Sequence, residues 1–207
     1  MNTPPPSDPQ EILESLTSLI PHLYHSLEAA IQAARSFFDE RNEKPDPYLF
    51  PCLVRYHAKL LLREREQAAD YEFDDLANNG LYLVFGEYPI RVLKSDDGRL
   101  PVPGNSKAKQ EFYNQQLSFT FMPGSVTLPM SRMNLVVLWD TDSLWNLERL
   151  TLVCPKAGGV TRESVETHWE IQIPHPALLE TAMVPTNAAG DLPMSLKSTA
   201  KRAKTNG

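Results

Sequence analysis

Two aspartates that follow an apolar run are the residues best placed for chemistry in this 207-residue chain. Asp140 and Asp142 come directly after the β-rich stretch 135–139, and a second such stretch ends in Cys154-Pro155-Lys156. Carboxylates at the end of one strand can hold Mg²⁺, and a lysine on the next strand can assist the attacking water. Acidic side chains and a lysine that follow two successive apolar runs are therefore candidates for hydrolytic chemistry.

This layout is similar to that of nucleases of the PD-(D/E)xK type, in which an acid stands two residues before the lysine. The resemblance implies a metal site in which Asp140 and Asp142 hold Mg²⁺ and Lys156 assists the attacking water. In this chain Cys154 occupies that position, and cysteine is a poor ligand for a hard ion such as Mg²⁺. Glu148 or Glu170 would have to supply the carboxylate from elsewhere. A polar turn at 140–143 explains the aspartates without a metal, and we favour it. A divergent metal-dependent nuclease is kept as the alternative function.

A second group of residues suggests binding rather than catalysis. Five bases lie within nineteen positions, with Tyr113 close by: Arg91, Lys94, Arg99, Lys107 and Lys109. Bases with aromatic neighbours are compatible with an anionic partner. A solvated sheet edge protected by lysines explains the same pattern without a partner. If the chain has a binding surface, we expect these six residues to form it.

Histidine and cysteine give no stronger signal. His22, His25 and Glu28 lie near one helical face, but nothing else in the helices supplies a further ligand or the outer partners that a zinc site needs. Cys52 and Cys154 lie inside apolar runs, which is typical of two buried, reduced thiols. We therefore predict neither a metal nor another cofactor.

Helical periodicity fills the first third of the chain. Ser7 or Asp8 should cap a helix whose first residue is Pro9, and Pro21 should break it, so that a second helix begins there and ends before Pro47. A third helix starts near Tyr48 or Pro51. The residues expected on its apolar face are Leu49, Phe50, Leu53, Val54, His57, Leu60 and Leu61.

Short β-rich runs follow the helices. They are residues 81–85, 90–94, 117–121, 135–139, 150–154 and 169–173, with a short helix from about 107 to 113. The connections between these runs are mostly short, which favours a meandering, mostly antiparallel sheet. Trp139 and Trp169 should be largely buried in its core, and the acidic stretch 70–75 should lead out of the helices.

Composition limits the class of protein. The chain is 42% hydrophobic and carries a net charge of −6, so a single core is expected and general nucleic-acid binding is disfavoured, although the 91–109 segment could support it locally. There is no apolar run of membrane-spanning length and no signal-peptide pattern at the start, so we expect a cytoplasmic protein without membrane contact.

These observations predict one α+β domain at residues 9–180, with a helical part at 9–76 and a sheet part at 81–174. The N-terminal helices should pack on a mostly antiparallel sheet of five to six strands. Residues 1–8 and the basic tail 181–207 should be disordered. The favoured function is a non-enzymatic interaction or regulatory protein that binds a protein or an anionic partner.

Overall fold

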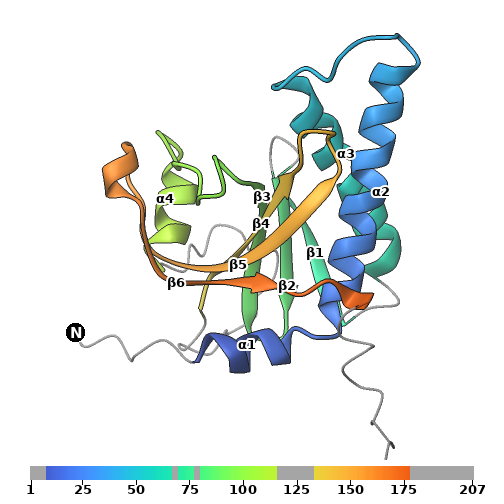
Figure 1. Ribbon diagram of the computed structural model, residues 1–207. Helices are drawn as coiled ribbons and strands as arrows, with labels where there is room; N and C mark the ends of the chain where they lie inside the picture. The colour runs from blue at the N-terminus through green and yellow to red at the C-terminus, as the bar shows by residue number, and fades with distance from the viewer. Residues whose placement is uncertain (1–7, 67–69, 77–79, 116–132, 178–207) are drawn as a thin grey trace, which may run out of the picture.

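The chain folds into an α+β arrangement in which helices come first and a sheet follows (Figure 1). The computed structural model describes residues 8–66, 70–76, 80–115 and 133–177, without the side chains of Asp75 and Leu76. Within these ranges the helices are α1 (Pro9–Ser15), α2 (Leu19–Asp39), α3 (Leu49–Arg65) and α4 (Lys107–Tyr113), with a 3-10 turn η4 (Arg162–Ser164). The strands are β1 (Tyr71–Leu76), β2 (Gly80–Phe85), β3 (Tyr88–Lys94), β4 (Leu135–Thr141), β5 (Leu147–Ala157) and β6 (Glu166–Ile173). The predicted strand at 117–121 lies outside the described residues.

The first two helices follow the expected capping chemistry. The Asp8 carboxylate accepts a hydrogen bond of 2.9 Å from the backbone N–H of Gln10, and Pro9 is the first helical residue, where no intrahelical donor is needed. The break falls at residues 16–18, before Pro21 and not at it. Pro21 lies in the first turn of α2, where its missing N–H costs no hydrogen bond.

The buried face of α3 is rotated from the predicted one. Phe50, Val54, Ala58 and Leu62 are fully buried. These residues repeat every four positions and form one ridge, which packs against α2 and the sheet. Because only this narrow row is covered, two residues predicted to be inside are exposed: Leu49 at 43% and Leu60 at 41%.

The six strands form one sheet in the order of the chain, β1-β2-β3-β4-β5-β6. All neighbouring pairs are antiparallel except β3 and β4, which run parallel with Ile90 opposite Leu135. The predicted mostly antiparallel sheet is confirmed, whereas the parallel pair was not predicted. A parallel pair needs a long crossover, and residues 95–134, which include α4, provide it.

The acidic stretch after α3 is an edge strand and not a lead-out segment. In β1, Tyr71 is buried and Phe73 packs against the core, while Glu72 alternates with them on the other face. β1 pairs with β2 alone, so one of its edges has no partner strand among the described residues. Charged side chains are common on such edges because they discourage pairing with other chains.

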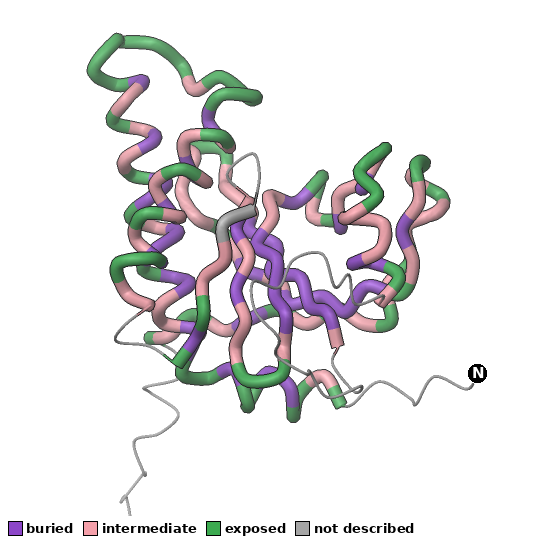
Figure 2. Tube along the Cα trace, turned by 180° about the vertical axis from the view of Figure 1, so that it is seen from behind, coloured by how far each residue is buried: buried purple, intermediate pink, exposed green. Residues whose placement is uncertain are grey.

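Alternation along the strands divides the core into two layers. Leu135, Val137 and Trp139 belong to the cluster formed with α1, α2 and α3. Val136 and Leu138 belong to a smaller cluster with Phe112 and Tyr113 near α4, on the other face. Figure 2 shows the buried positions running along the central strands and the inner sides of the helices.

Among the described residues, none of the helices combines the length and apolar character needed to cross a bilayer.

Trp139 is expected to be a major stabilising residue because its side chain is fully buried. We predict that Trp139→Ala lowers the free energy of unfolding by about 3–5 kcal/mol in denaturant titrations. Trp169 is buried only in part, so Trp169→Ala should cost about half as much. Trp139→Phe is the control, because it keeps a ring and removes an indole N–H that lacks a hydrogen-bond partner. Equal losses for both alanine variants would contradict this ranking.

The two cysteines differ, contrary to the prediction that both are buried. Cys52 is exposed on α3, whereas Cys154 is 1% exposed in β5, and burial raises the pKa of its thiol to about 12. We predict that a thiol reagent modifies one cysteine in the native protein and both after denaturation. Cys52→Ser should abolish the native reaction and Cys154→Ser should leave it unchanged, as measured by mass spectrometry.

Candidate functional site

The five bases of the 91–109 segment do not form one surface. Lys94 lies opposite Trp139 in the β3–β4 ladder, and its Nζ is 5.8 Å from the centre of that aromatic ring. Lys107 is exposed on α4, where its Nζ lies 3.8 Å from a carboxylate oxygen of Glu111. The remaining three bases lie at two separate sites. Arg99 lines a pocket, whereas Arg91 and Lys109 lie between β3 and α4.

A tight turn after β3 carries most of the pocket. Asp97 and Gly98 have φ angles of 50° and 74°, as the two central residues of a type I′ turn require. The backbones of Asp96 and Arg99 exchange two hydrogen bonds of 2.9 and 3.0 Å across it. The hydroxyl of buried Ser95 accepts a further bond of 3.3 Å from the Gly98 N–H. The turn therefore holds Asp96 and Arg99 side by side.

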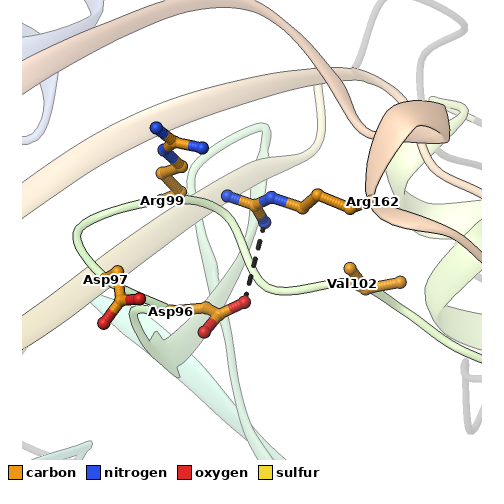
Figure 3. Close-up of a pocket in the computed structure, with 5 residues that line it drawn as sticks. All are labelled: Asp96, Asp97, Arg99, Val102 and Arg162. Carbon is orange, nitrogen blue, oxygen red and sulfur yellow. Dashed lines mark ion pairs between the residues drawn. The ribbon is translucent and has the colours of Figure 1, made fainter.

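The pocket lies between this turn and η4 (Figure 3). It has a volume of about 380 Å³ and is lined by Asp96, Asp97, Arg99, Val102 and Arg162. Arg162 Nη1 donates a hydrogen bond of 2.5 Å to the Leu100 carbonyl and lies 3.8 Å from Asp96 Oδ2. Arg99 forms no ion pair with a described residue. The unused donors of two guanidinium groups can bind a carboxylate or a phosphate.

Sequence reasoning missed Arg162. This residue lies in a 3-10 turn between β5 and β6, more than fifty positions beyond the basic segment. Its surroundings predict only a loop, because no motif links it to the 95–102 turn. The pairing of distant strands brings the two together.

Asp140, the first aspartate of the predicted metal site, is engaged in an ion pair. Arg149 Nη2 donates to Asp140 Oδ2 at 2.9 Å, and the two residues face each other in the β4–β5 ladder. The Arg149 guanidinium also packs directly under Gly98, where an added Cβ atom would clash with it. The Asp140–Arg149 ion pair therefore packs against the pocket turn at Gly98.

Asp142 closes the β4–β5 hairpin. Its Oδ1 accepts hydrogen bonds of 2.8 Å from the backbone N–H groups of Leu144 and Asn146, and its Oδ2 accepts one of 3.1 Å from the Asn146 side chain. These bonds, above all those from Asn146, lower the pKa of the Asp142 carboxyl. Such contacts are typical of an aspartate that shapes a turn.

Lys156 lies far from both aspartates. It forms an ion pair of 2.6 Å with Glu166 on β6, and it is seven residues beyond Arg149 along β5, which corresponds to about 23 Å. The structure therefore does not bring Asp140, Asp142 and Lys156 together. In the part of the chain that the structure describes, no group of three or more His, Cys, Asp or Glu side chains could hold a metal ion.

Amide side chains clamp α4 to the sheet. The Gln115 side chain donates to the carbonyls of Asn134 and Pro155 at 3.1 and 2.6 Å, and it accepts 2.7 Å from the Asn134 N–H. Asn134 Nδ2 donates 2.9 Å to the Phe112 carbonyl. These bonds join the end of α4 to Asn134, which immediately precedes β4, and to β5. These hydrogen bonds hold the short helix at a fixed distance from the sheet.

Tyr113 and Arg91 are buried, although we expected them on an exposed binding surface. Tyr113 is 0% exposed, and its hydroxyl donates 3.0 Å to the Pro101 carbonyl, so it ties the 95–106 loop to α4. Arg91 is 6% exposed, and its guanidinium carbon lies 4.8 Å from the centre of the Phe112 ring. Burial lowers the pKa of Arg91. Tyr113 therefore acts through packing, and Arg91 is a buried cation.

Comparisons with known proteins add no assignment. The chain matches no protein-family model, and it matches neither a curated protein nor a solved structure. Inferences about function therefore rest on the geometry of the pocket and of the α4 layer.

Substitution of Gly98 should disturb the pocket turn more than a matched change elsewhere. Gly98 and Gly104 both have positive φ, but only at Gly98 would a Cβ atom meet another residue, Arg149. We predict that Gly104→Ala costs about 1 kcal/mol and Gly98→Ala about 2 kcal/mol in urea unfolding, because at Gly98 the Arg149 Nη2 must also move and weaken its ion pair with Asp140. Equal costs at the two positions would show that Arg149 moves aside freely.

Proposed function

We propose that the protein is a non-enzymatic interaction or regulatory module that binds an acidic group of a protein partner in the Arg99–Arg162 pocket. The observation that carries this proposal is the pair of guanidinium groups lining a cavity of about 380 Å³, with Arg99 unpaired among the described residues. Arginine forks suit carboxylates because two parallel N–H donors match two oxygens. A cavity of this size accepts a side chain rather than a folded element.

The rim of the pocket favours a protein partner over a nucleic acid. Asp96 and Asp97 line the same cavity as the two arginines, so a polyanion would meet repulsion as well as attraction. The net charge of −6 adds to that repulsion. A protein surface can instead present one acidic side chain to the arginines and basic neighbours to the aspartates. Mixed charges of this kind give specificity as well as affinity.

The metal-dependent nuclease stays the second candidate but has less support. Asp140 is paired with Arg149, Asp142 is used in a turn, and Lys156 is paired with Glu166. Each of these contacts would have to be given up before the three residues could act together. No observation on the described residues favours that rearrangement.

Charge reversal in the pocket tests the proposal. A fluorescein-labelled hexaglutamate peptide serves as the acidic probe, with binding followed by fluorescence anisotropy at low salt. We predict that Arg99→Glu weakens binding by about tenfold, because one of two guanidinium donors is replaced by a like charge. Affinity should also fall with added salt, since the exposed charges are screened over about 8–10 Å.

Lys107→Glu is the matched control. It makes the same change in net charge on an exposed side chain outside the pocket and should alter affinity by less than about twofold. Equal losses in Arg99→Glu and Lys107→Glu, or no binding by the unaltered protein, would contradict the proposed pocket. Calorimetric binding of Mg²⁺ that is lost in Asp140→Asn would favour the nuclease instead.

A further inference from the structure

Arg91 is a buried cation that has no counter-ion among the residues the structure describes. It lies in the middle of β3, opposite Tyr82 on one side and Val136 on the other, under the aromatic ring of Phe112. Its Nε is buried without a hydrogen-bond partner, and its guanidinium forms no hydrogen bond or ion pair with a described residue. Contact with an aromatic ring offsets part of the cost of burying a charge, but it satisfies no N–H donor.

Lys109 lies one turn before Phe112 on α4, and the Arg91 guanidinium lies against the Phe112 ring, so Lys109 brings a second positive charge to this part of the layer. It is partly buried on α4, and it forms no ion pair with a described residue. Burial lowers the pKa of its ammonium group, and the charges of Arg91 and, less strongly, Arg55 lower it further. Arg55 itself has a buried Nε without a partner. Cations brought together in this way repel one another unless an anion lies between them.

The chain offers few acids that could neutralise these cations. The acid on α4, Glu111, is directed to Lys107. Asp74 lies opposite Tyr82, two strands away from Arg91 and thus about 10 Å distant. Residues 116–132, which follow α4 and are not described, contain no aspartate or glutamate. The acids whose side chains the structure leaves undescribed are Asp75, Glu180 and Asp191.

We propose that Arg91 and Lys109 form a binding site for a phosphate monoester dianion, distinct from the Arg99–Arg162 pocket and independent of the function proposed for it. Two cations are balanced by a ligand with two negative charges, and a phosphate monoester carries about −1.5 to −2 at neutral pH. The planar fork of Arg91 supplies directed donors, and Lys109 supplies a mobile point charge at the more accessible side. The ligand is either a small phosphorylated molecule or a phosphorylated side chain of a protein.

Charge-matched probes test this site on the full-length protein. Isothermal calorimetry compares phenyl phosphate, which is a dianion at pH 7.5, with the monoanions dimethyl phosphate and acetate. The Nε–H resonance of Arg91 in ¹⁵N-labelled protein reports whether the guanidinium is the group contacted. We expect phenyl phosphate to bind about tenfold more tightly than either monoanion and to shift that resonance.

Substitutions distinguish binding at this site from non-specific electrostatic attraction to the protein surface. Lys109→Gln should weaken phenyl phosphate binding by about tenfold, whereas Lys107→Gln, on the same helix but outside the site, should change it by less than about twofold. Arg91→Lys keeps the charge but loses the fork, and it should also weaken binding. Because Arg91 is buried and its variant can fail to fold, the Lys109 and Lys107 pair decides the outcome by itself.

Three results would overturn the inference. One is equal affinity for acetate, dimethyl phosphate and phenyl phosphate. Another is equal binding by the Lys109 and Lys107 variants. The third is phenyl phosphate binding only when Asp75→Asn, Glu180→Gln and Asp191→Asn are combined. The last result would mean that the chain supplies its own carboxylate. If phenyl phosphate binds, a phosphoserine pentapeptide distinguishes the two kinds of ligand. Tighter binding of the pentapeptide than of phenyl phosphate indicates a phosphorylated protein as the ligand. Equal affinity for the two probes indicates a small phosphate ester. A negative result with phenyl phosphate does not affect the test of the Arg99–Arg162 pocket with hexaglutamate. A negative result with hexaglutamate likewise does not affect the test of the Arg91–Lys109 site.

Discussion

Every side chain from Leu135 to Trp139 is buried, so β4 requires an apolar cover on both faces of the sheet. The N-terminal helices can cover only one of them. The other face must be closed by the connection between β3 and β4, and because these two strands are parallel, that connection has to cross from one end of the sheet to the other. Residues 95–134 carry α4 in this crossover. The position of α4, and of everything attached to it, follows from the burial of a single strand.

The second layer is thin, and its stability comes from specific contacts as well as from apolar area. A helix of seven residues has little stability by itself. Gln115 and Asn134 bind its C-terminal end to β4 and β5, and the Tyr113 hydroxyl binds the preceding loop. Gly158 permits this packing, since a Cβ atom there would lie 2.5 Å from the Tyr113 ring. Because few residues form this layer, polar groups at its margins are accessible to a ligand.

Both proposed binding places belong to this layer. The Arg99–Arg162 pocket is formed where the loop before α4 meets η4, and Arg162 is tied to that loop through the Leu100 carbonyl. Arg91 lies beneath α4 because strand alternation directs Ile90 and Val92 to the helical face and the residue between them to the other. The thick apolar layer stabilises the fold, and the thin one holds two groups of cations: Arg99 and Arg162, whose pocket also contains Asp96 and Asp97, and Arg91 with Lys109, which form no ion pair with a described residue. Binding functions are common where a rigid sheet positions loops in this way.

The sequence by itself determined the α+β class, the start of α1 at Pro9 with a cap at Ser7 or Asp8, the short helix near 107–113 and the mostly antiparallel sheet, because local periodicity and turn residues encode these features. It also identified Arg91, Arg99 and Lys109 as residues to consider. Tertiary structure decided which of them meet. Strand alternation places Arg91 and Val92 on opposite faces of the sheet, but only the tertiary structure shows that the face of Arg91 is covered by α4. Arg162 joined Arg99 through strand pairing, and Asp140 was claimed by Arg149, neither of which leaves a local signal. The face of α3 and the edge strand β1 were misjudged for the same reason: the number of neighbours that cover a residue is set by distant parts of the chain.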